Sequence, residues 1–266
     1  MAIQVPTGID TLSVTVSEHV ARIVIDNRQR KNAIDLAGWR AIAELVPQLA
    51  ARDDVRVIVL AGQGADFCAG ADISEFDTVR RDAATARIYE GANSAAFAAI
   101  RTAAVPVVAA IRGICFGGGF GLAAACDLRI ATADARFAVP AARLGLAYPQ
   151  DAMVDIVSAA GPQMARYLTL TAEPIGAEKA FAAGFLFEIV EDDRFDSRVS
   201  DVARAIAASA PLSVRASRLS IMSVVAPDPV IARMAREAGE ATFDSADYAE
   251  GRAAFRERRK PRFEGR

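Results

Sequence analysis

The sequence predicts an α/β protein with a helical C-terminal region, and three features of its patterning lead to this prediction. Short β-branched runs alternate with alanine-rich helical stretches over the first part of the chain, which is typical of a sheet covered by helices. Beyond about residue 150 the strand signals fade and helical periodicity dominates. With 266 residues, 53% of them hydrophobic, the chain can bury a large core without disulfide or metal staples. We expect a core over residues 1–195 and a helical region over residues 196–266.

The elements of the core are expected in the following order. Two alternating apolar stretches, residues 12–16 and 20–25, flank Ser17, Glu18 and His19 and indicate a β-hairpin. Apolar positions repeat at helical spacing over residues 36–49, and the β-branched run 55–61 indicates a buried strand. The remaining expected elements are a helix over 79–101 and strands over 106–111, 127–131 and 136–139.

Composition and charge exclude several function classes. The net charge of -2 argues against general affinity for nucleic acid. No run of about 18 apolar residues is present, so no membrane span is expected, and residues 1–10 lack the pattern of a secretory signal. The cysteines, Cys68, Cys115 and Cys126, have no CxxC spacing, and we expect reduced thiols in a cytoplasmic protein. A single histidine, His19, excludes a zinc site built from several imidazoles, and we expect no metal.

Residues 113–127, GICFGGGFGLAAACD, form a glycine-rich segment between a predicted strand and a predicted helix. Glycine lets a ligand approach the backbone closely, and the amides at a helix N-terminus are unpaired and favour negative charge. Such a turn suits an anion or a developing oxyanion. Taken alone, it is equally typical of tight packing between a strand and a helix.

Two other functions are compatible with fragments of this segment. Residues 119–124 fit GxGxxA loosely, but no ribose-binding acid follows a second strand and no GK[ST] triplet is present. Residues 113–117 fit the GxCxG of a nucleophile elbow, but that fold requires its histidine after the nucleophile, whereas His19 comes before it. An oxyanion hole of backbone amides requires no side chain, which is compatible with a chain containing one histidine.

Residues 66–73, DFCAGADI, form a second segment of small residues after the predicted strand 55–61. Taken alone, it is an ordinary loop that enters a helix capped by Asp72 or Ser74. Together, the two segments strongly resemble the paired oxyanion-hole motifs of the crotonase superfamily, which includes enoyl-CoA hydratases and isomerases. RKNAI at 30–34, FAVPAARLGL at 137–146 and EGRAAFRERRKPRF at 250–263 extend the resemblance over nearly the whole chain.

The resemblance implies a β-β-α spiral core and a helical C-terminal region that builds a homotrimer or a dimer of trimers. It implies that the amides of Ala71 and Gly118 polarise the carbonyl of an acyl-CoA thioester, so that coenzyme A is part of the substrate and no separate cofactor is needed. Lys31 would reach the CoA phosphates, and Phe255 and Arg258 would cover the CoA of the same or a neighbouring subunit. The other implied substrate contacts are Ala33, Ala69, Asp72, Ile73, Cys115, Gly117, Pro140, Ala141, Leu146 and Tyr148.

The chain departs from the hydratase pattern at the two positions of the acid–base glutamates, where it has Gly121 and Ala141. Each positioned acid or base contributes roughly 10²–10⁴ in rate. We therefore expect thioester polarisation to survive and hydration to be largely lost. Isomerisation, thioester hydrolysis, decarboxylation or another enolate reaction is then as compatible as hydration, and the small residues predict a roomier acyl pocket. A catalytically silent acyl-CoA binder is the alternative.

Asp151 is a candidate substitute for the missing carboxylates. It lies in the segment LGLAYPQD, which borders the acyl pocket in relatives of this family. Two roles are open: Asp151 caps a helix that starts near Ala152, or it faces the thioester as an acid or base. Tyr148 is a second candidate.

Overall fold

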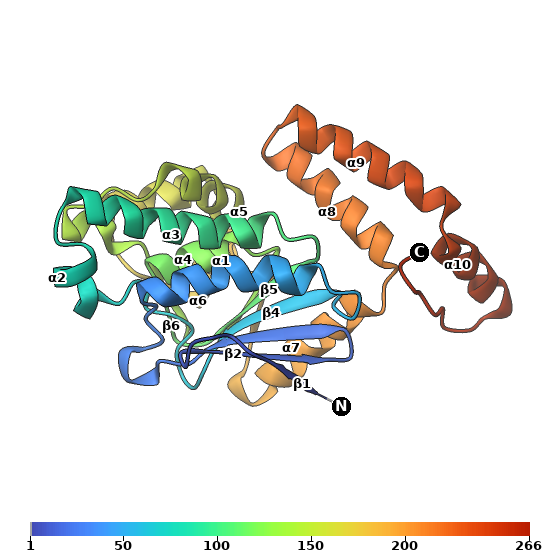
Figure 1. The fold of residues 1–266 in the computed structure, drawn as a ribbon, viewed down its shortest axis with the longest axis horizontal. Helices are drawn as coiled ribbons and strands as arrows, with labels where there is room; N and C mark the ends of the chain where they lie inside the picture. Colours follow the sequence, from blue (N-terminus) through green and yellow to red (C-terminus); the bar gives the residue numbers. More distant parts are fainter. Residues whose placement is uncertain (1) are drawn as a thin grey trace.

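The computed structural model describes residues 2–266, in which the strands form two sheets (Figure 1). The larger sheet has seven strands in the order β1-β2-β3-β4-β5-β7-β10, and the smaller has the order β6-β8-β9. The hairpin β2–β3 is antiparallel, whereas β3, β4, β5, β7 and β10 run parallel. The strands are β1 Ile3–Val5, β2 Leu12–Ser17, β3 Val20–Ile25, β4 Val57–Gly62, β5 Val107–Ile111, β6 Ile114–Phe116, β7 Leu128–Thr132, β8 Arg136–Ala138, β9 Ile175–Gly176 and β10 Glu188–Val190.

Helices cover both faces of the larger sheet, with α1 and α3 on one face and α7 on the other (Figure 1). The helices are α1 Leu36–Ala50, α2 Phe76–Val79, α3 Ala83–Arg101, α4 Gly118–Ala125, α5 Gln150–Thr171, α6 Ala177–Ala182, α7 Asp192–Ala207, α8 Pro211–Val225, α9 Pro229–Ala241 and α10 Ala246–Glu257. Short 3₁₀ turns are η1 Arg28–Arg30, η2 Ile73–Glu75, η3 Pro140–Leu144 and η4 Thr242–Asp244. None of the helices within residues 2–266 combines the length and the apolar character that crossing a bilayer requires.

The β-branched run of β4 divides its side chains between two cores. Ile58 and Leu60 belong to the larger core under α1 and α3. Val57 and Val59 belong to the smaller core under α7. Because successive side chains of a strand point to opposite faces, a strand between two helical layers is apolar at every position. The prediction of a buried strand here is confirmed.

Two predicted boundaries of the core are wrong. The helix expected over residues 79–101 begins at Ala83, because Asp82 accepts a hydrogen bond from Thr85 N and closes a capping box there. The domain boundary expected at residues 195/196 falls inside α7, whose apolar residues Phe195 and Val199 pack on the sheet. Burying each such side chain contributes roughly 1.5–3 kcal/mol, so α7 is part of the core.

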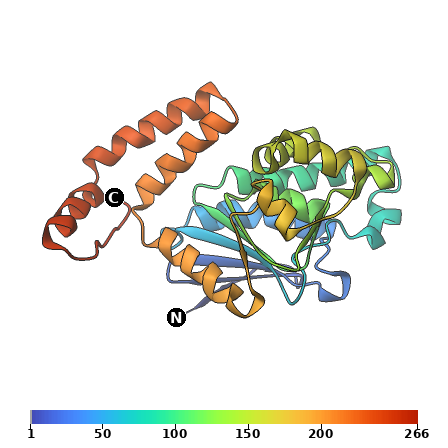
Figure 2. The ribbon, with the colours of Figure 1, turned by 180° about the vertical axis from the view of Figure 1, so that it is seen from behind.

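The last three helices stand apart from the sheet. Figures 1 and 2 show the α8–α9 hairpin and α10 projecting from one end of the core, joined to it after α7. One contact between the two regions involves a buried arginine: Arg218 of α8, which is 8% exposed, pairs with the partly buried Asp127 at 2.8 Å. Arg218 also donates to the carbonyls of Ala103 and Arg101 at the end of α3. The arginine therefore fixes the helical region to the core.

Candidate active site

Two loops from separate parts of the chain meet at the start of α4. Backbone bonds join them, because Cys68 N donates to Ile114 O at 2.9 Å and Phe116 N donates to Cys68 O at 3.0 Å. A Cβ atom on Gly70 would lie only 2.9 Å from the nitrogen of Gly118. Gly70 also has a φ of +99°, which favours glycine. The loop after β4 can therefore approach α4 this closely only with glycine at position 70.

The amides of Ala71 and Gly118 have no hydrogen-bond acceptor within residues 2–266. The position of Ala71 is fixed by its neighbours, because Ile34 N donates to Gly70 O at 2.8 Å and Asp72 N donates to Ile34 O at 2.9 Å. Gly118 is the first residue of α4, where an N–H group has no intrahelical partner and the helix dipole favours negative charge. Two available donors therefore lie on adjoining backbone segments.

Both residues line one cavity of about 170 Å³. Most of the residues predicted to contact the substrate share it, although they come from four separate stretches of the chain. The predicted residues in its wall are Ala69, Ala71, Ile73, Gly117, Gly118, Pro140, Ala141, Leu146 and Tyr148. The residues that the sequence did not indicate are Phe76, Arg80, Glu90, Asn93, Phe97, Leu144, Ala147 and Pro149.

Three other predicted residues support the loop without lining the cavity. The carbonyl of Lys31 accepts from Ala69 N at 2.9 Å, while its side chain is exposed. Ala33 is buried. Asp72 caps the turn η2, as one of the two interpretations of this loop expected, and it pairs with Arg30 at 2.6 Å. Lys31 and Asp72 hold the chain that presents Ala71, and any contact they make with coenzyme A stays a prediction.

Cys115, Phe255 and Arg258 lie away from the cavity. Cys115 is completely buried in the core, and this burial raises the pKa of its thiol well above the ordinary value. The prediction that it contacts the substrate is corrected to a packing role. Phe255, which is 86% exposed, and Arg258 lie at the end of α10, at the far side of the core from α2 (Figure 1). Their contact with coenzyme A stays a prediction, and it would require a neighbouring subunit.

Tyr148 fills the space that the loss of a glutamate side chain was expected to open. A Cβ atom on Gly121 would lie 2.4 Å from Tyr148 Oη and 2.6 Å from the Phe97 ring. The Tyr148 hydroxyl donates to Gly117 O at 2.9 Å. Burial, and then the charge of Glu90, raise the pKa of Tyr148 above its ordinary value, so it is a neutral phenol. The expectation of extra room at position 121 is therefore wrong.

Asp151 has neither of the two roles that the sequence left open. The helix α5 begins at Gln150, so Asp151 lies in its first turn and the capping position is Pro149, which offers no side-chain cap. The Asp151 carboxylate is exposed, accepts from Ser94 Oγ at 3.2 Å, and does not line the cavity.

The sequence did not indicate three polar side chains that line the cavity from α3 and the segment before it. Arg80 forms an ion pair with Glu90, and its guanidinium lies 4.6 Å from the Phe76 ring centroid. Asn93 is 7% exposed, and its Oδ1 has no hydrogen-bond partner. Glu90 and Asn93 are three residues apart, which places them on one face of α3. The one sequence signal for this part of the cavity was Asn93, a polar carboxamide on an otherwise alanine-rich helix.

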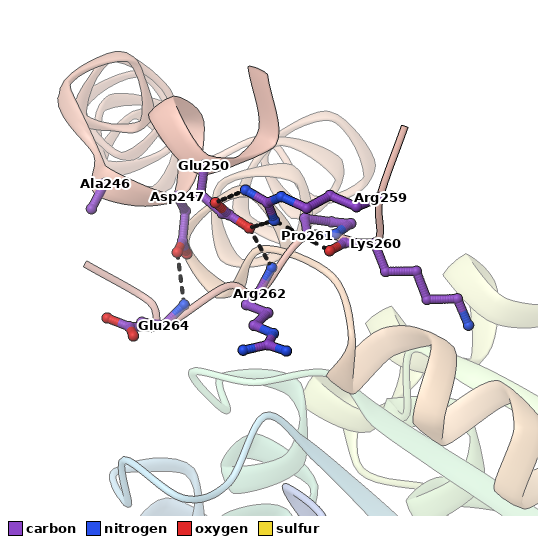
Figure 3. A pocket seen from close by; sticks show the side chains of 8 residues that line it. All are labelled: Ala246, Asp247, Glu250, Arg259, Lys260, Pro261, Arg262 and Glu264. Carbon is purple, nitrogen blue, oxygen red and sulfur yellow. Dashed lines mark hydrogen bonds and ion pairs between the residues drawn. The ribbon is translucent and has the colours of Figure 1, made fainter. Parts of the chain in front are cut away.

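A second, wider hollow of about 780 Å³ lies at the C-terminal segment (Figure 3). Its carboxylates bind the chain itself: Glu250 pairs with Arg259 at 2.6 Å and accepts from Arg262 N at 2.8 Å. The hydrogen bond from Arg259 holds the pKa of Glu250 at about 2. Asp247 accepts from Glu264 N at 2.7 Å. These contacts fold the C-terminal segment back on α10, and none of the predicted catalytic residues lies here.

Comparison with known proteins supports the fold and identifies the family. The profile described as enoyl-CoA hydratase/isomerase matches residues 15–266. A solved enoyl-CoA hydratase/carnithine racemase from Magnetospirillum magneticum has a TM-score of 0.92 and 34% identity, covering 99% of this chain and 97% of that chain. An enoyl-CoA hydratase from Bacillus anthracis has a TM-score of 0.90 and 27% identity, covering 97% of this chain and 100% of that chain. The crotonase-type fold expected from the sequence is confirmed.

Two curated relatives carry different activities in their names. The crotonyl-CoA hydratase of Syntrophomonas wolfei is 30% identical over 249 residues, which are 92% of this chain and 95% of the relative. The (7aS)-7a-methyl-1,5-dioxo-2,3,5,6,7,7a-hexahydro-1H-indene-carboxyl-CoA hydrolase of Rhodococcus jostii is 34% identical over 200 residues, which are 75% of this chain and 74% of the relative. The profile match and these similarities show that the chain belongs to the enoyl-CoA hydratase/isomerase family.

Proposed function

We propose that this protein is an enzyme that binds an acyl-CoA thioester and holds its carbonyl oxygen between the amides of Ala71 and Gly118. The observation that carries the proposal is the pair of partnerless N–H groups on adjoining backbone segments at the wall of one cavity. Fixed donors of this kind stabilise negative charge that develops on an oxygen, and deleting one typically costs about 3–4 kcal/mol of barrier. A thioester carbonyl gains that charge when its α-carbon loses a proton.

The proposed reaction class is one in which negative charge develops on the thioester oxygen. In isomerisation and decarboxylation the charge develops as an enolate, and in thioester hydrolysis it develops as a tetrahedral intermediate. Hydration by two glutamates is not favoured, because the positions that supply them are Gly121 and Ala141. Tyr148 Oη and the Phe97 ring occupy the space beside Gly121, so no water-binding carboxylate fits there. The family includes a hydrolase and an isomerase among the relatives of this chain, which is compatible with this assignment.

The proposed acyl group is small or compact. A cavity of about 170 Å³ is close to the roughly 150 Å³ that holds a benzene-sized ligand in an apolar protein interior. Its wall is apolar at Ile73, Leu144 and Leu146, and the polar side chains gather at α3 and the segment before it. Coenzyme A would remain outside the cavity as the carrier of the acyl group.

The test is exchange of the α-protons of CoA esters in D₂O, followed by mass spectrometry. Acetyl-, butyryl- and phenylacetyl-CoA serve as probes, and crotonyl-CoA hydration is measured in parallel. We expect enzyme-dependent exchange, with hydration at least about 10²-fold slower than for a hydratase that has both glutamates. A hydration rate within about tenfold of such an enzyme would contradict the interpretation that Gly121 and Ala141 remove the acid and base of hydration. Calorimetric binding of the esters without any exchange or hydrolysis would instead identify a silent acyl-CoA binder.

The substitution Gly121→Glu should fail to create a hydratase. A side chain at position 121 meets the Tyr148 hydroxyl and the Phe97 ring, so we expect overpacking to lower the free energy of unfolding by about 1–3 kcal/mol. Thermal unfolding and crotonyl-CoA turnover measure the two effects. The matched control is Ala141→Glu, because Ala141 lines the open cavity. If the Gly121→Glu variant gained crotonyl-CoA hydration and the Ala141→Glu variant did not, the Tyr148 side chain would have to move aside at little cost in free energy.

We also propose that the chain assembles into a homotrimer or a dimer of trimers through its C-terminal helices. Large apolar side chains are exposed on α8 and α9, among them Ile221, Val224 and Val230. Clusters of this kind on a helical unit that projects from the core are typical of a surface that another subunit covers. Light scattering coupled to size-exclusion chromatography measures the assembly, and a monomer at micromolar concentration would contradict it.

A further inference from the structure

The cavity has one polar end. Arg80, Glu90 and Asn93 line the cavity from α3 and the segment before that helix, and Tyr148 lines it from the segment before α5. Among the residues of 2–266 that line this cavity, Glu90 is the one with a carboxylate. The remaining wall is backbone and apolar side chains, which cannot accept or return a proton.

Arg80 fixes the position of Glu90. The arginine side chain is 7% exposed, and its guanidinium lies over the rings of Phe76 and Tyr89 at 4.6 and 5.1 Å from their centroids. An exposed ion pair between mobile side chains contributes little to stability. This guanidinium, however, is also held by the two aromatic rings, so its position does not depend on the carboxylate alone. Because arginine does not release its proton in proteins, Glu90 is the member of the pair that can move one.

Asn93 shows that a polar partner is missing at this end of the cavity. Its side chain is 7% exposed and its Oδ1 has no hydrogen-bond partner. Buried acceptors are nearly always hydrogen-bonded in folded proteins, because an unsatisfied one is destabilising. Asn93 lies one helical turn from Glu90, so a polar group of a bound ligand or a water would meet both side chains.

Tyr148 is a poor alternative for the proton transfer. Its hydroxyl already donates to Gly117 O at 2.9 Å, and burial raises its pKa above the ordinary value. A phenol that holds its proton so firmly does not act as a base near neutral pH. Its contact instead anchors the backbone immediately before Gly118.

We propose that Glu90 is the catalytic carboxylate of this enzyme and that Arg80 is its positioning residue. The inference rests on the proposed function. The Glu90 carboxylate takes a proton from the α-carbon of the thioester, and the electron pair of that C–H bond becomes the C=C bond of an enolate. The carbonyl π pair moves to oxygen, where the Ala71 and Gly118 amides meet the charge. The protonated Glu90 then returns its proton to the α-carbon, or to the γ-carbon when the acyl group is unsaturated.

Glu90→Gln tests the proposal, because it keeps the shape of the side chain and removes its basicity. We expect α-proton exchange of the CoA esters in D₂O to fall at least about 10²-fold, while their dissociation constants by calorimetry change less than about threefold. The acidic limb of the pH–rate profile should disappear with the carboxylate. Glu90→Asp should recover part of the rate, and added formate should partly rescue Glu90→Ala.

The matched control is Glu44→Gln, an exposed glutamate on α1 outside the cavity, which should exchange like the wild type. Arg80→Met should lower exchange less than Glu90→Gln does and shift the pH profile, since the carboxylate stays but loses its anchor. Wild type and Glu90→Gln exchanging at equal rates would overturn the role of Glu90 and leave the proposed function standing. Wild-type protein that neither exchanges nor hydrolyses any of the esters would overturn both.

Discussion

Replacing Ala71 by proline is expected to lower the rate of α-proton exchange about 10²–10³-fold, which is the cost of deleting one oxyanion donor. Proline has no N–H group, so the substitution removes the donor that we assign to the thioester oxygen. The Ala71 amide makes no hydrogen bond within residues 2–266, so no contact inside the protein is lost with it. Exchange of butyryl-CoA in D₂O measures the effect.

Ala71→Ser is the matched control, because it keeps the N–H group and is of similar size. It should retain exchange within about tenfold of the wild type. A second readout separates lost chemistry from lost structure. Cinnamoyl-CoA absorbs at longer wavelength when its carbonyl is polarised, so bound cinnamoyl-CoA should shift fully in the serine variant and less in the proline variant, which keeps only the Gly118 donor. A full shift with the proline variant would show that the Ala71 amide does not touch the oxygen.

The main-chain half of the site could be predicted from the sequence because it is local. Gly70 and Gly118 belong to two continuous motifs, and each motif carries its own reason for small residues. Gly70 needs a positive φ beside α4, and a Cβ on Gly118 would lie 2.7 Å from the Trp39 ring. Small residues in a sequence therefore directly indicate positions where another backbone segment or side chain packs close to the main chain. The positions of β2, β3, β4, β5, β7 and β8 along the chain were predictable for a similar reason, since period-2 and β-branched runs are local signals.

The side-chain half of the site depends on packing between distant segments. Tyr148 fills the space beside Gly121 from a loop that follows η3, and no local pattern records that contact. Glu90 and Asn93 lie on an alanine-rich helix whose sequence does not indicate that Arg80, from the segment before the helix, pairs with Glu90. Asp151 was a candidate for the pocket or for a helix cap because of its place in a motif. The structure places it in the first turn of α5, outside the cavity. The helix begins two residues before the expected position, and boundary errors of this size are usual for helix ends.

Arg218→Met is expected to lower the free energy of unfolding by about 3–5 kcal/mol, the usual cost of breaking a buried ion pair by removing one partner. Arg218 is 8% exposed and pairs with Asp127 at 2.8 Å. Its guanidinium also donates to the carbonyls of Ala103 and Arg101 at 2.7 and 2.8 Å. Methionine has a similar length but no donor, so these acceptors lose their partner together. Thermal unfolding at a fixed protomer concentration measures the loss.

The control is Arg204→Met on α7, which makes the same change in an exposed ion pair with Asp201. Both side chains of that pair are more than half exposed, so we expect a change of about 0–1 kcal/mol. Because Arg218 joins α8 to the end of α3, its loss should also expose the link between α7 and α8 to limited proteolysis before the core unfolds. Equal stability of the two variants would mean that packing of α8, and not this arginine, holds the helical region to the core.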